Sequence, residues 1–463
     1  MSDSVFLSAW AACADLGRTP LAPTALLQAR RSWFDTAAAT LGGTRARCTA
    51  SAVESCRVTD AGAPLRPWDE ALVLGTASHA LDYDDVCMLA VCHPSAPVVS
   101  ALMALLPVVE AVRPGLRFDQ LLAAYLVGTE TLLRLGEWLG YRHYALGFHA
   151  TSTLGAVGAA AACAHALDLP DGQARAALSI AASSACGLRA NFGTDVKPLH
   201  VGFAAAAGLR AVLLARAGAQ ASDDVWGAEG FALAFDGGMA PADAPWRSNT
   251  PWAIESPGFE HKRFPSCYLT HRLIAGVLRL RERQSPALQA QPMSINIELP
   301  KTGRAALKYP RPATGLEGKF SAEYCAAAAW IDGHVGLHSF TDAAVQRQAI
   351  MAAMSRVVVQ ERAGADEPLD RSPVRVRIRH AQGEDGVLVD WAPGSLADPL
   401  GADDLVAKWA DCARYAGVQA DQSLAQALLE GALDANATNM LGPLRRLLLS
   451  ASGISVAQID VLN

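Results

Sequence analysis

From about residue 5 to residue 235, apolar positions recur at intervals near 3.6 residues, the spacing of amphipathic helices. Gly, Pro and Asp interrupt the pattern and mark the helix ends. The segment 152–167 consists almost entirely of small residues, so we expect its neighbours to approach closely and to surround it at the centre of a bundle. The predicted helices cover 20–41, 69–82, 97–113, 118–138, 152–167, 173–186 and 199–217.

The pattern changes after about residue 265. One more helix, 269–284, precedes a strand candidate at 293–300. Residues 374–380 and 387–391 alternate with period two, as half-buried strands do, and 383–386 between them is typical of a hairpin turn. From about residue 403 the helical spacing returns.

This order predicts a mainly α protein with two domains. A chain of 463 residues is long for a single hydrophobic core. We expect a large all-helical domain, residues 1–265 and 403–463, with an inserted smaller α+β domain, residues 266–402.

Composition and charge narrow the class of protein. The 39 basic and 45 acidic residues give a net charge of −6 without a block of one sign, which argues against a nucleic-acid or membrane-surface binder. The N-terminus lacks the basic region of a signal peptide. The longest apolar stretch, 97–112, is interrupted by Pro107 and Glu110, so we expect no membrane span. Ten cysteines without a CxxC pair indicate reduced thiols and a cytoplasmic protein.

Common nucleotide and hydrolase motifs are absent from the sequence: it contains no G-x-G-x-x-G, no P-loop, no G-x-S-x-G and no H-E-x-x-H. The densest ionisable group is the segment 79–95, which holds three carboxylates and two imidazoles among apolar residues. If it is helical, Asp82 and Asp85 share one face and His79 lies one turn before Asp82. We interpret it as a substrate-binding or acid–base site, with a hard-metal site or a solvated helix end as alternatives.

Two further groups precede predicted helices. In 141–153, Thr151 or Ser152 is the expected N-cap, so that His149 would stand beside free N–H groups suited to a carboxylate; a structural hydrogen bond is the alternative. In 191–200, Pro198 fits the first helical position and places Lys197 at the cap. A cation there needs an offsetting anion, either a structural acid or, as we favour, a substrate carboxylate.

Two groups lie in the predicted smaller domain or at its edge. The basic cluster 261–271 falls where the helical pattern ends, and ligand sites favour domain boundaries. Cys267 has no identifiable partner for nucleophilic chemistry, and Tyr324, on an Ala-rich helix, suits core packing when taken alone. As a set, these Asp, His, Lys and Tyr residues suit removal of a proton next to a carboxylate, with cations stabilising the charge that develops.

The sequence resembles the MmgE/PrpD family, which includes 2-methylcitrate dehydratases, cis-aconitate decarboxylases and iminodisuccinate epimerases. The motifs that carry the resemblance are HALDYDD…HPSAPV (79–98), GFHATSTLGAVGAA (147–160), NFGTDVKPLH (191–200), KRFPSCYLTH (262–271) and GKFSAEY (318–324). The resemblance implies a large helical domain with a smaller α+β domain, a homodimer, and neither a metal nor an organic cofactor.

The resemblance also implies the site residues. His149 or His93 would be the acid or base at carbon, and Asp82 would orient an imidazole. Lys197 would hold a carboxylate, and Tyr324 would protonate a leaving group or an intermediate. The implied or candidate substrate-binding residues are Arg142, Lys262, Cys267 and His271.

Departures from the family patterns affect the expected reaction. Val86 and Cys267 stand where the decarboxylase pattern has Thr and His, which counts against decarboxylation. The runs 191–194, 250–254 and 265–268 look most like the epimerase branch, whereas Tyr324 resembles the lyases. We therefore expect first a 2-methylcitrate dehydratase-type hydro-lyase acting on a di- or tricarboxylic acid. The alternatives are an imino- or amino-dicarboxylate epimerase, then a cis-aconitate decarboxylase or a non-catalytic carboxylate binder.

Overall fold

The computed structural model describes residues 5–57, 64–227, 229–239, 252–285, 294–304, 307–364 and 372–459. The chain forms two compact units: residues 1–260 with 405–463, and residues 261–404. The predicted domain boundaries at 265 and 403 stay predictions.

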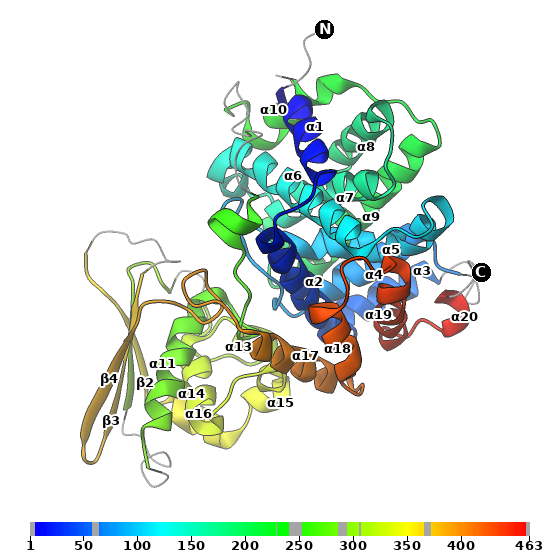
Figure 1. The fold of residues 1–463 in the computed structure, drawn as a ribbon. Helices are drawn as coiled ribbons and strands as arrows, with labels where there is room; N and C mark the ends of the chain where they lie inside the picture. The colour runs from blue at the N-terminus through cyan, green and yellow to red at the C-terminus, as the bar shows by residue number, and fades with distance from the viewer. Residues whose placement is uncertain are drawn as a thin grey trace. The chain divides into compact units, whose positions relative to one another are not determined.

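The first unit is built of helices (Figure 1), as the 3.6-residue spacing predicts. The C-terminal helices α18 and α19 return to pack against the N-terminal α2, and α19 also packs against α5. The described helices of this unit are α1 Val5–Gly17, α2 Pro23–Gly43, α3 Arg47–Cys56, α4 Pro67–His79, α5 Ser95–Val112, α6 Phe118–Ala145, α7 Ala150–Ala166, α8 Asp171–Ser183, α9 Val196–Arg216, α10 Phe231–Asp236, α18 Gln422–Glu430, α19 Ala437–Ala451 and α20 Val456–Ile459; α17, Ala402–Ala416, begins at the end of the second unit.

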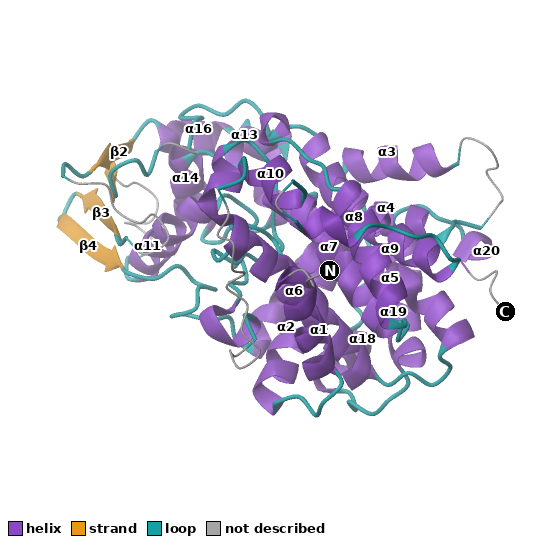
Figure 2. Ribbon diagram, turned by 90° about the horizontal axis from the view of Figure 1, so that it is seen from above, coloured by secondary structure: helices purple, strands orange, loops and turns teal. Residues whose placement is uncertain are grey.

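Helix α7 is the centre of the first unit, in agreement with its small residues. It packs against α5, α6, α8 and α9 (Figure 2), and almost all of its side chains are buried. Glycines allow these close approaches. A Cβ added to Gly158 would lie 2.8 Å from the carbonyl oxygen of Gly128 in α6, and one added to Gly208 in α9 would lie 2.6 Å from the carbonyl oxygen of Ala156.

Two helices of the described residues, α5 and α9, are long and apolar enough to span a membrane by length and composition. However, 72% of the apolar window of α5 and 61% of that of α9 are buried inside the structure. Burial of this kind is what core helices of a soluble protein show.

The second unit combines helices with a four-stranded sheet of order β2-β1-β3-β4. β1 and β2 run parallel, while β1–β3 and β3–β4 are antiparallel. Its elements are α11 His271–Glu282, β1 Ser294–Leu299, α13 Gly315–Gly318, α14 Ala322–Asp332, α15 Asp342–Val345, α16 Gln348–Met354, β2 Val357–Glu361, β3 Val374–His380 and β4 Gly383–Val389. The mainly α fold with a smaller α+β part is therefore confirmed.

The predicted hairpin turn was wrong in its position. Residues 383–386 belong to β4, and His380 pairs directly with Gly383, so residues 381–382 make the turn. Gly383 accepts the unusual φ of 149° at the start of the strand. The strand β2 was not predicted. Met293, at the start of the predicted strand 293–300, lies outside the described residues.

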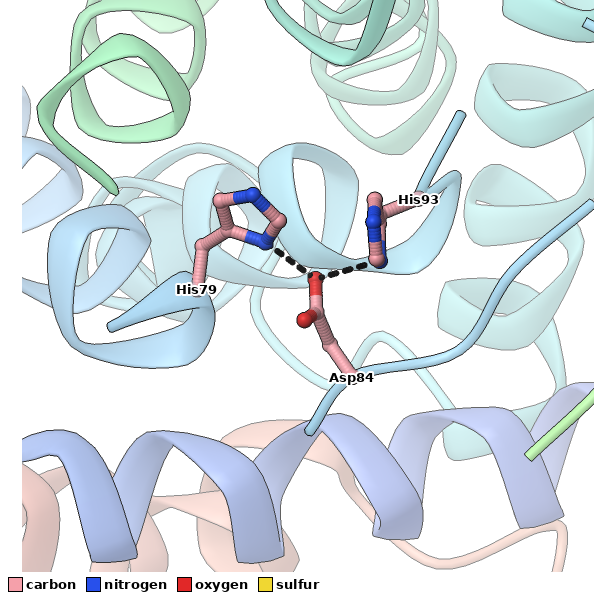
Figure 3. A group of neighbouring side chains, drawn as sticks. All are labelled: His79, Asp84 and His93. Atoms are coloured by element: carbon pink, nitrogen blue, oxygen red, sulfur yellow. Dashed lines mark hydrogen bonds and ion pairs between the residues drawn. The ribbon is translucent and has the colours of Figure 1, made fainter. Parts of the chain in front are cut away.

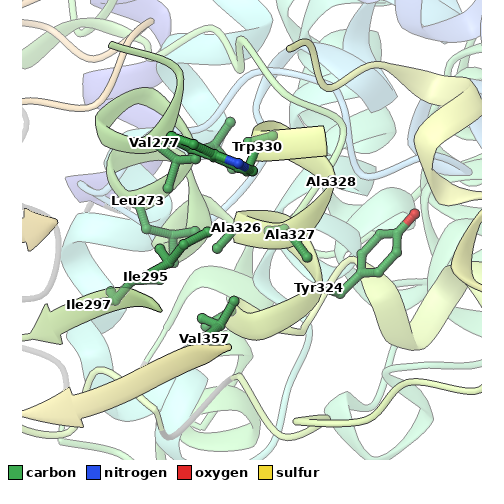
Figure 4. Packing of buried hydrophobic residues seen from close by; sticks show 14 of the residues in the cluster. Leu273, Val277, Ile295, Ile297, Tyr324, Ala326, Ala327, Ala328, Trp330 and Val357 are labelled. Atoms are coloured by element: carbon green, nitrogen blue, oxygen red, sulfur yellow. The ribbon is translucent and has the colours of Figure 1, made fainter. Parts of the chain in front are cut away.

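The core of the second unit lies between its helices and its sheet (Figure 4). Leu273 and Val277 of α11 and Trp330 of α14 pack with Ile295 and Ile297, which point inward from β1. All five are at most 2% exposed, so this core is closed to solvent.

Candidate active site

The candidate site of the first unit begins where α4 ends. Helix α4 stops at His79, so the prediction of a helix through residue 82 was wrong by three residues. Asp82 has a φ of +54°, a left-handed conformation that ends a helix and that Asp tolerates better than most residues. Asp82 and Asp85 therefore do not share a helix face, and the acidic residues lie on the loop from residue 80 to residue 94.

This loop brings two imidazoles to one carboxylate (Figure 3). Nδ1 of His79 lies 2.8 Å from Oδ2 of Asp84 in a hydrogen bond, and Nδ1 of His93 lies 3.3 Å from the same oxygen. The side chains of His79 and Asp84 have no exposed surface, whereas the side chain of His93 is 14% exposed. The three residues form a group with one member at the surface; we call it the His79–Asp84–His93 cluster.

The cluster contains an ionised carboxylate at neutral pH. Burial of Asp84 opposes its ionisation, but the contacts with His79 and His93 outweigh burial and hold the pKa of this carboxyl well below its usual range. Burial lowers the pKa of His79 to about 4, against the opposing attraction of Asp84. Asp84 is therefore a carboxylate and His79 a neutral imidazole at pH 7.

Asp82 connects the cluster to Lys197. Nζ of Lys197 donates a hydrogen bond of 2.8 Å to Oδ1 of Asp82, and Nε2 of His93 lies 3.9 Å from the same oxygen. Burial opposes the charge of Lys197, but Asp82 outweighs it and raises the pKa of the ammonium group.

The predicted start of the helix after Lys197 was also wrong. Helix α9 begins at Val196, so Lys197 is its second residue and Pro198 its third. In this structure the Asp82 carboxylate offsets the charge of Lys197. The substrate carboxylate that we favoured as its partner stays a prediction.

A second pair of imidazoles adjoins the cluster. His149 is itself the N-cap of α7, so the predicted caps Thr151 and Ser152 were wrong. Nδ1 of His149 lies 3.1 Å from Nδ1 of His200 in α9, and the rings of His149 and His79 have centroids 5.7 Å apart. Burial, with contributions from His79 and Lys197, lowers the pKa of His149 well below its usual value.

Asp85 has a structural role. It is fully buried and accepts hydrogen bonds from the backbone N–H and the hydroxyl of Ser95, the first residue of α5. The Ser95 hydroxyl also lies 2.6 Å from the hydroxyl of Tyr125. Burial raises the pKa of Asp85 well above its usual value, opposite to the shift of the neighbouring Asp84.

The remaining predicted residues belong to other segments of the chain. Arg142, at the end of α6, donates to the carbonyl oxygen of Asp236 at 2.9 Å. Lys262, Cys267 and His271 are buried in the second unit. Tyr324 lies in the apolar core of that unit (Figure 4), where its hydroxyl donates to the carbonyl oxygen of Ser339 and burial raises its pKa. Their assignment to a site stays a prediction.

Three members of the site were missing from the predicted set: His79, Asp84 and His200. His79 and Asp84 were visible as part of the polar segment 79–95, but a helical interpretation of that segment favoured Asp82 and Asp85. His200 carried no signal of its own, because a histidine one turn into an apolar helix is typical of a core residue.

The donor set of the His79–Asp84–His93 cluster also suits a metal ion. One ligand atom from each residue lies within 4.8 Å of the others, and two imidazoles with one carboxylate are a common donor set for transition metals. The expected independence from metal stays a prediction.

The chain is a mainly helical protein of two units, and the first unit gathers imidazoles, carboxylates and a lysine in one place. Residues 7–242 match the MmgE/PrpD N-terminal domain, and residues 264–433 match the MmgE/PrpD C-terminal domain. The chain belongs to the MmgE/PrpD family, as its motifs predicted.

Curated relatives are cis-aconitate decarboxylases. The human protein is 31% identical over 303 residues, which cover 64% of this chain and 62% of that protein. The mouse protein is also 31% identical, over 64% of this chain and 61% of its own length. The Aspergillus terreus protein is 27% identical over 62% of each chain. The matches thus span about three fifths of the length of these relatives.

Proposed function

We propose that this protein is a lyase that transfers a proton at a carbon atom next to a carboxylate of a di- or tricarboxylic acid. The observation that carries the proposal is the convergence on Asp82: the Lys197 ammonium group lies 2.8 Å and His93 Nε2 3.9 Å from one carboxylate oxygen. A cation and an imidazole around one carboxylate oxygen are the groups that binding of a substrate carboxylate and proton transfer beside it require.

Within this class we propose decarboxylation of cis-aconitate as the first reaction. The names of the human, mouse and fungal relatives support it. The bond to the departing carboxyl group breaks with loss of CO2, and the electron pair that remains takes up a proton delivered by an imidazole. This order reverses the expectation from the sequence, which placed dehydration first.

Dehydration of a 2-methylcitrate-type hydroxy acid is the second candidate. It is favoured by Val86 and Cys267, which depart from the decarboxylase pattern. The epimerase alternative relied partly on the run 250–254, of which Thr250 and Pro251 lie outside the described residues.

One experiment separates these reactions. The purified protein is incubated in D2O with cis-aconitate, 2-methylcitrate, citrate or iminodisuccinate and followed by proton NMR. Release of CO2 from cis-aconitate with one deuterium in the product supports the decarboxylase. A vinylic signal from 2-methylcitrate or citrate supports the dehydratase instead. Deuterium exchange without elimination identifies an epimerase, and no turnover of any compound contradicts the proposed function.

The remaining expectations are proposals too: no organic cofactor, a homodimer and a cytoplasmic location. The roles of Lys262, Cys267, His271 and Tyr324 belong with them. Alanine substitution of each residue, followed by measurement of substrate affinity and turnover, tests whether the second unit contributes to the reaction.

A further inference from the structure

We propose that Cys87 and Cys92 are a site of oxidative modification, where a small-molecule disulfide of the glutathione class converts two free thiols into an intrachain disulfide bond. The bond closes the base of the turn 88–91 and holds the loop that carries Asp84 and His93. This modification site is independent of the proposed function and holds whatever reaction the protein catalyses.

The backbone pairs the two cysteines directly. The N–H of Cys87 donates to the carbonyl oxygen of Cys92 at 2.9 Å, and the N–H of Cys92 donates to the carbonyl oxygen of Cys87 at 3.2 Å, in an isolated antiparallel bridge. Residues paired in this way have Cα atoms about 5.5 Å apart and side chains on the same face, and disulfides occur at Cα separations of about 4.4–6.8 Å. Their Cβ atoms are about 4.5–5.5 Å apart, so a small twist of the turn completes the approach. All ten cysteines lie in the described ranges, and no other two of them exchange backbone hydrogen bonds.

Both thiols are enclosed in the protein. Cys87 and Cys92 are at most 1% exposed. Burial raises the pKa of the Cys87 thiol to about 12 and the pKa of the Cys92 thiol well above its usual value, and Cys87 itself contributes to the shift at Cys92. The thiolate is the form that attacks a disulfide, so the pair reacts when the loop opens to solvent. We therefore expect slow oxidation that follows the opening of the loop.

The turn between the two cysteines is strained and reaches the surface. Val91 has a φ of +50°, a left-handed conformation that β-branched residues rarely adopt. Such a conformation persists only where the surrounding contacts fix it, and the two hydrogen bonds of the bridge close this turn at its base. Met88, at the other end of the turn, is 45% exposed. A covalent bond across the base keeps the strained turn from opening the loop.

The reaction balances with one molecule of the small disulfide. The thiolate of one cysteine attacks a sulfur atom of the reagent, which releases one small thiol and leaves a mixed disulfide on the protein. The thiolate of the second cysteine attacks the protein sulfur of that mixed disulfide and releases the second small thiol. The two protein thiols are oxidised, the reagent is reduced, and the two protons end on the released thiols.

Mass spectrometry of the full-length protein tests whether the bond forms. The reduced protein is incubated with oxidised glutathione under native conditions, its remaining thiols are alkylated after denaturation, and its peptides are mapped without reduction. We expect a Cys87–Cys92 bond that forms more slowly than the mixed disulfide of the exposed Cys186, and faster at a low, non-denaturing concentration of urea. If Cys87 and Cys92 remain thiols at equilibrium with an excess of the reagent that fully modifies Cys186, the proposal is overturned.

Hydrogen exchange tests whether the bond holds the loop. The backbone amides of Cys87 and Cys92 should exchange about 10-fold more slowly, or slower still, in the oxidised than in the reduced wild-type protein, because a closed loop has fewer open states. Cys92→Ala, treated in the same way, is the control and should show no change. A bond that forms only in the urea-unfolded protein, or one that accelerates exchange in the loop, would mean that the native turn does not accommodate it and would overturn the proposal. If Cys92→Ala does not fold, the map and the exchange rates of the wild-type protein still decide.

Discussion

Lys408 is a buried ammonium group that joins three distant segments. Its Nζ lies 2.7 Å from Oδ1 of Asp35 in α2 and 2.6 Å from the carbonyl oxygen of Tyr83, between Asp82 and Asp84. Both charged side chains are at most 1% exposed. We expect Lys408→Met to destabilise the protein by about 3–5 kcal/mol, because it leaves the Asp35 carboxylate buried without its counter-charge. Urea unfolding measures the change.

The double variant Asp35→Asn/Lys408→Met tests whether the unpaired Asp35 charge causes this loss of stability. Removal of both charges should recover about half of the lost stability, since no buried ion then lacks a partner. A double variant as unstable as Lys408→Met would show that packing of the Lys408 side chain, and not its charge, stabilises the loop.

Lys197 offers a prediction about binding. Lys197→Met should weaken the binding of cis-aconitate about 10–100-fold, because a hydrogen bond to a charged group is worth roughly 1.5–3 kcal/mol. Isothermal titration calorimetry gives the affinity. Arg175→Met is the comparison: Arg175 of α8 pairs with Asp171, so its loss should change the affinity less. An equal effect of both substitutions would contradict the site described here.

Asp84 and Asp85 are neighbouring residues whose different surroundings could not be predicted from the sequence. They are adjacent, yet Asp84 contacts two imidazoles that lower its pKa, whereas Asp85 accepts hydrogen bonds from Ser95 and burial raises its pKa. Residue types singled out 79–95 as a polar segment, and the structure brings its polar side chains together. Which carboxylate joins it depends on a loop conformation, including the positive φ of Asp82, that periodicity does not encode.

At the scale of elements, the contact between α6 and α7 depends on glycine. A Cβ on Gly158 would lie 2.8 Å from the carbonyl oxygen of Gly128 and 2.8 Å from Cβ of Leu132, so the helices would have to separate. We expect Gly158→Ala to cost about 1–3 kcal/mol of unfolding free energy, measured in urea. The matched control is Gly172→Ala in α8, where an added Cβ meets nothing within 4 Å.

The control substitution should change the unfolding free energy in the opposite direction. Alanine has the higher helix propensity, so Gly172→Ala should be neutral or stabilising by up to about 1 kcal/mol. If both substitutions stabilise the protein, the helices are not held at the described separation.

Helices were more predictable than their ends or the sheet. The 3.6-residue spacing extends over whole elements and predicted the positions of α4, α5, α7, α8 and α9. The ends depend on single residues: His149 caps α7, although neighbouring Thr and Ser are the stronger cap formers. The hairpin was misplaced because two glycines, Gly383 and Gly386, each suit a turn and only pairing with β3 decides between them.

At the scale of the whole molecule, buried histidines make stability depend on pH. Burial lowers the pKa of His79 and of His165 to about 4, from an ordinary value near 6.5. Between about pH 4 and pH 6.5, the unfolded chain therefore binds protons at these two imidazoles that the folded chain does not bind. Stability should be complete above about pH 6.5 and fall as pH drops towards 4, by a few kcal/mol.

Urea unfolding at several values between pH 4 and pH 8 measures this slope. His165→Gln should make the slope shallower by about one proton, because it removes one such group. His334→Gln is the control, since His334 is exposed and should leave the slope unchanged. A slope independent of His165 would mean that this imidazole is protonated in the folded protein.

The return of residues 405–463 to the first unit has a consequence for biosynthesis. The ribosome must release the whole second unit before Lys408 emerges. Lys408 follows Asp35 by 373 positions and Tyr83 by 325, so the Asp35 carboxylate and the Tyr83 carbonyl lack this partner while those residues are translated. At about 5–20 residues per second this interval lasts tens of seconds. The nascent first unit therefore reaches its final form only near the end of translation, and chaperones have that period in which to bind it.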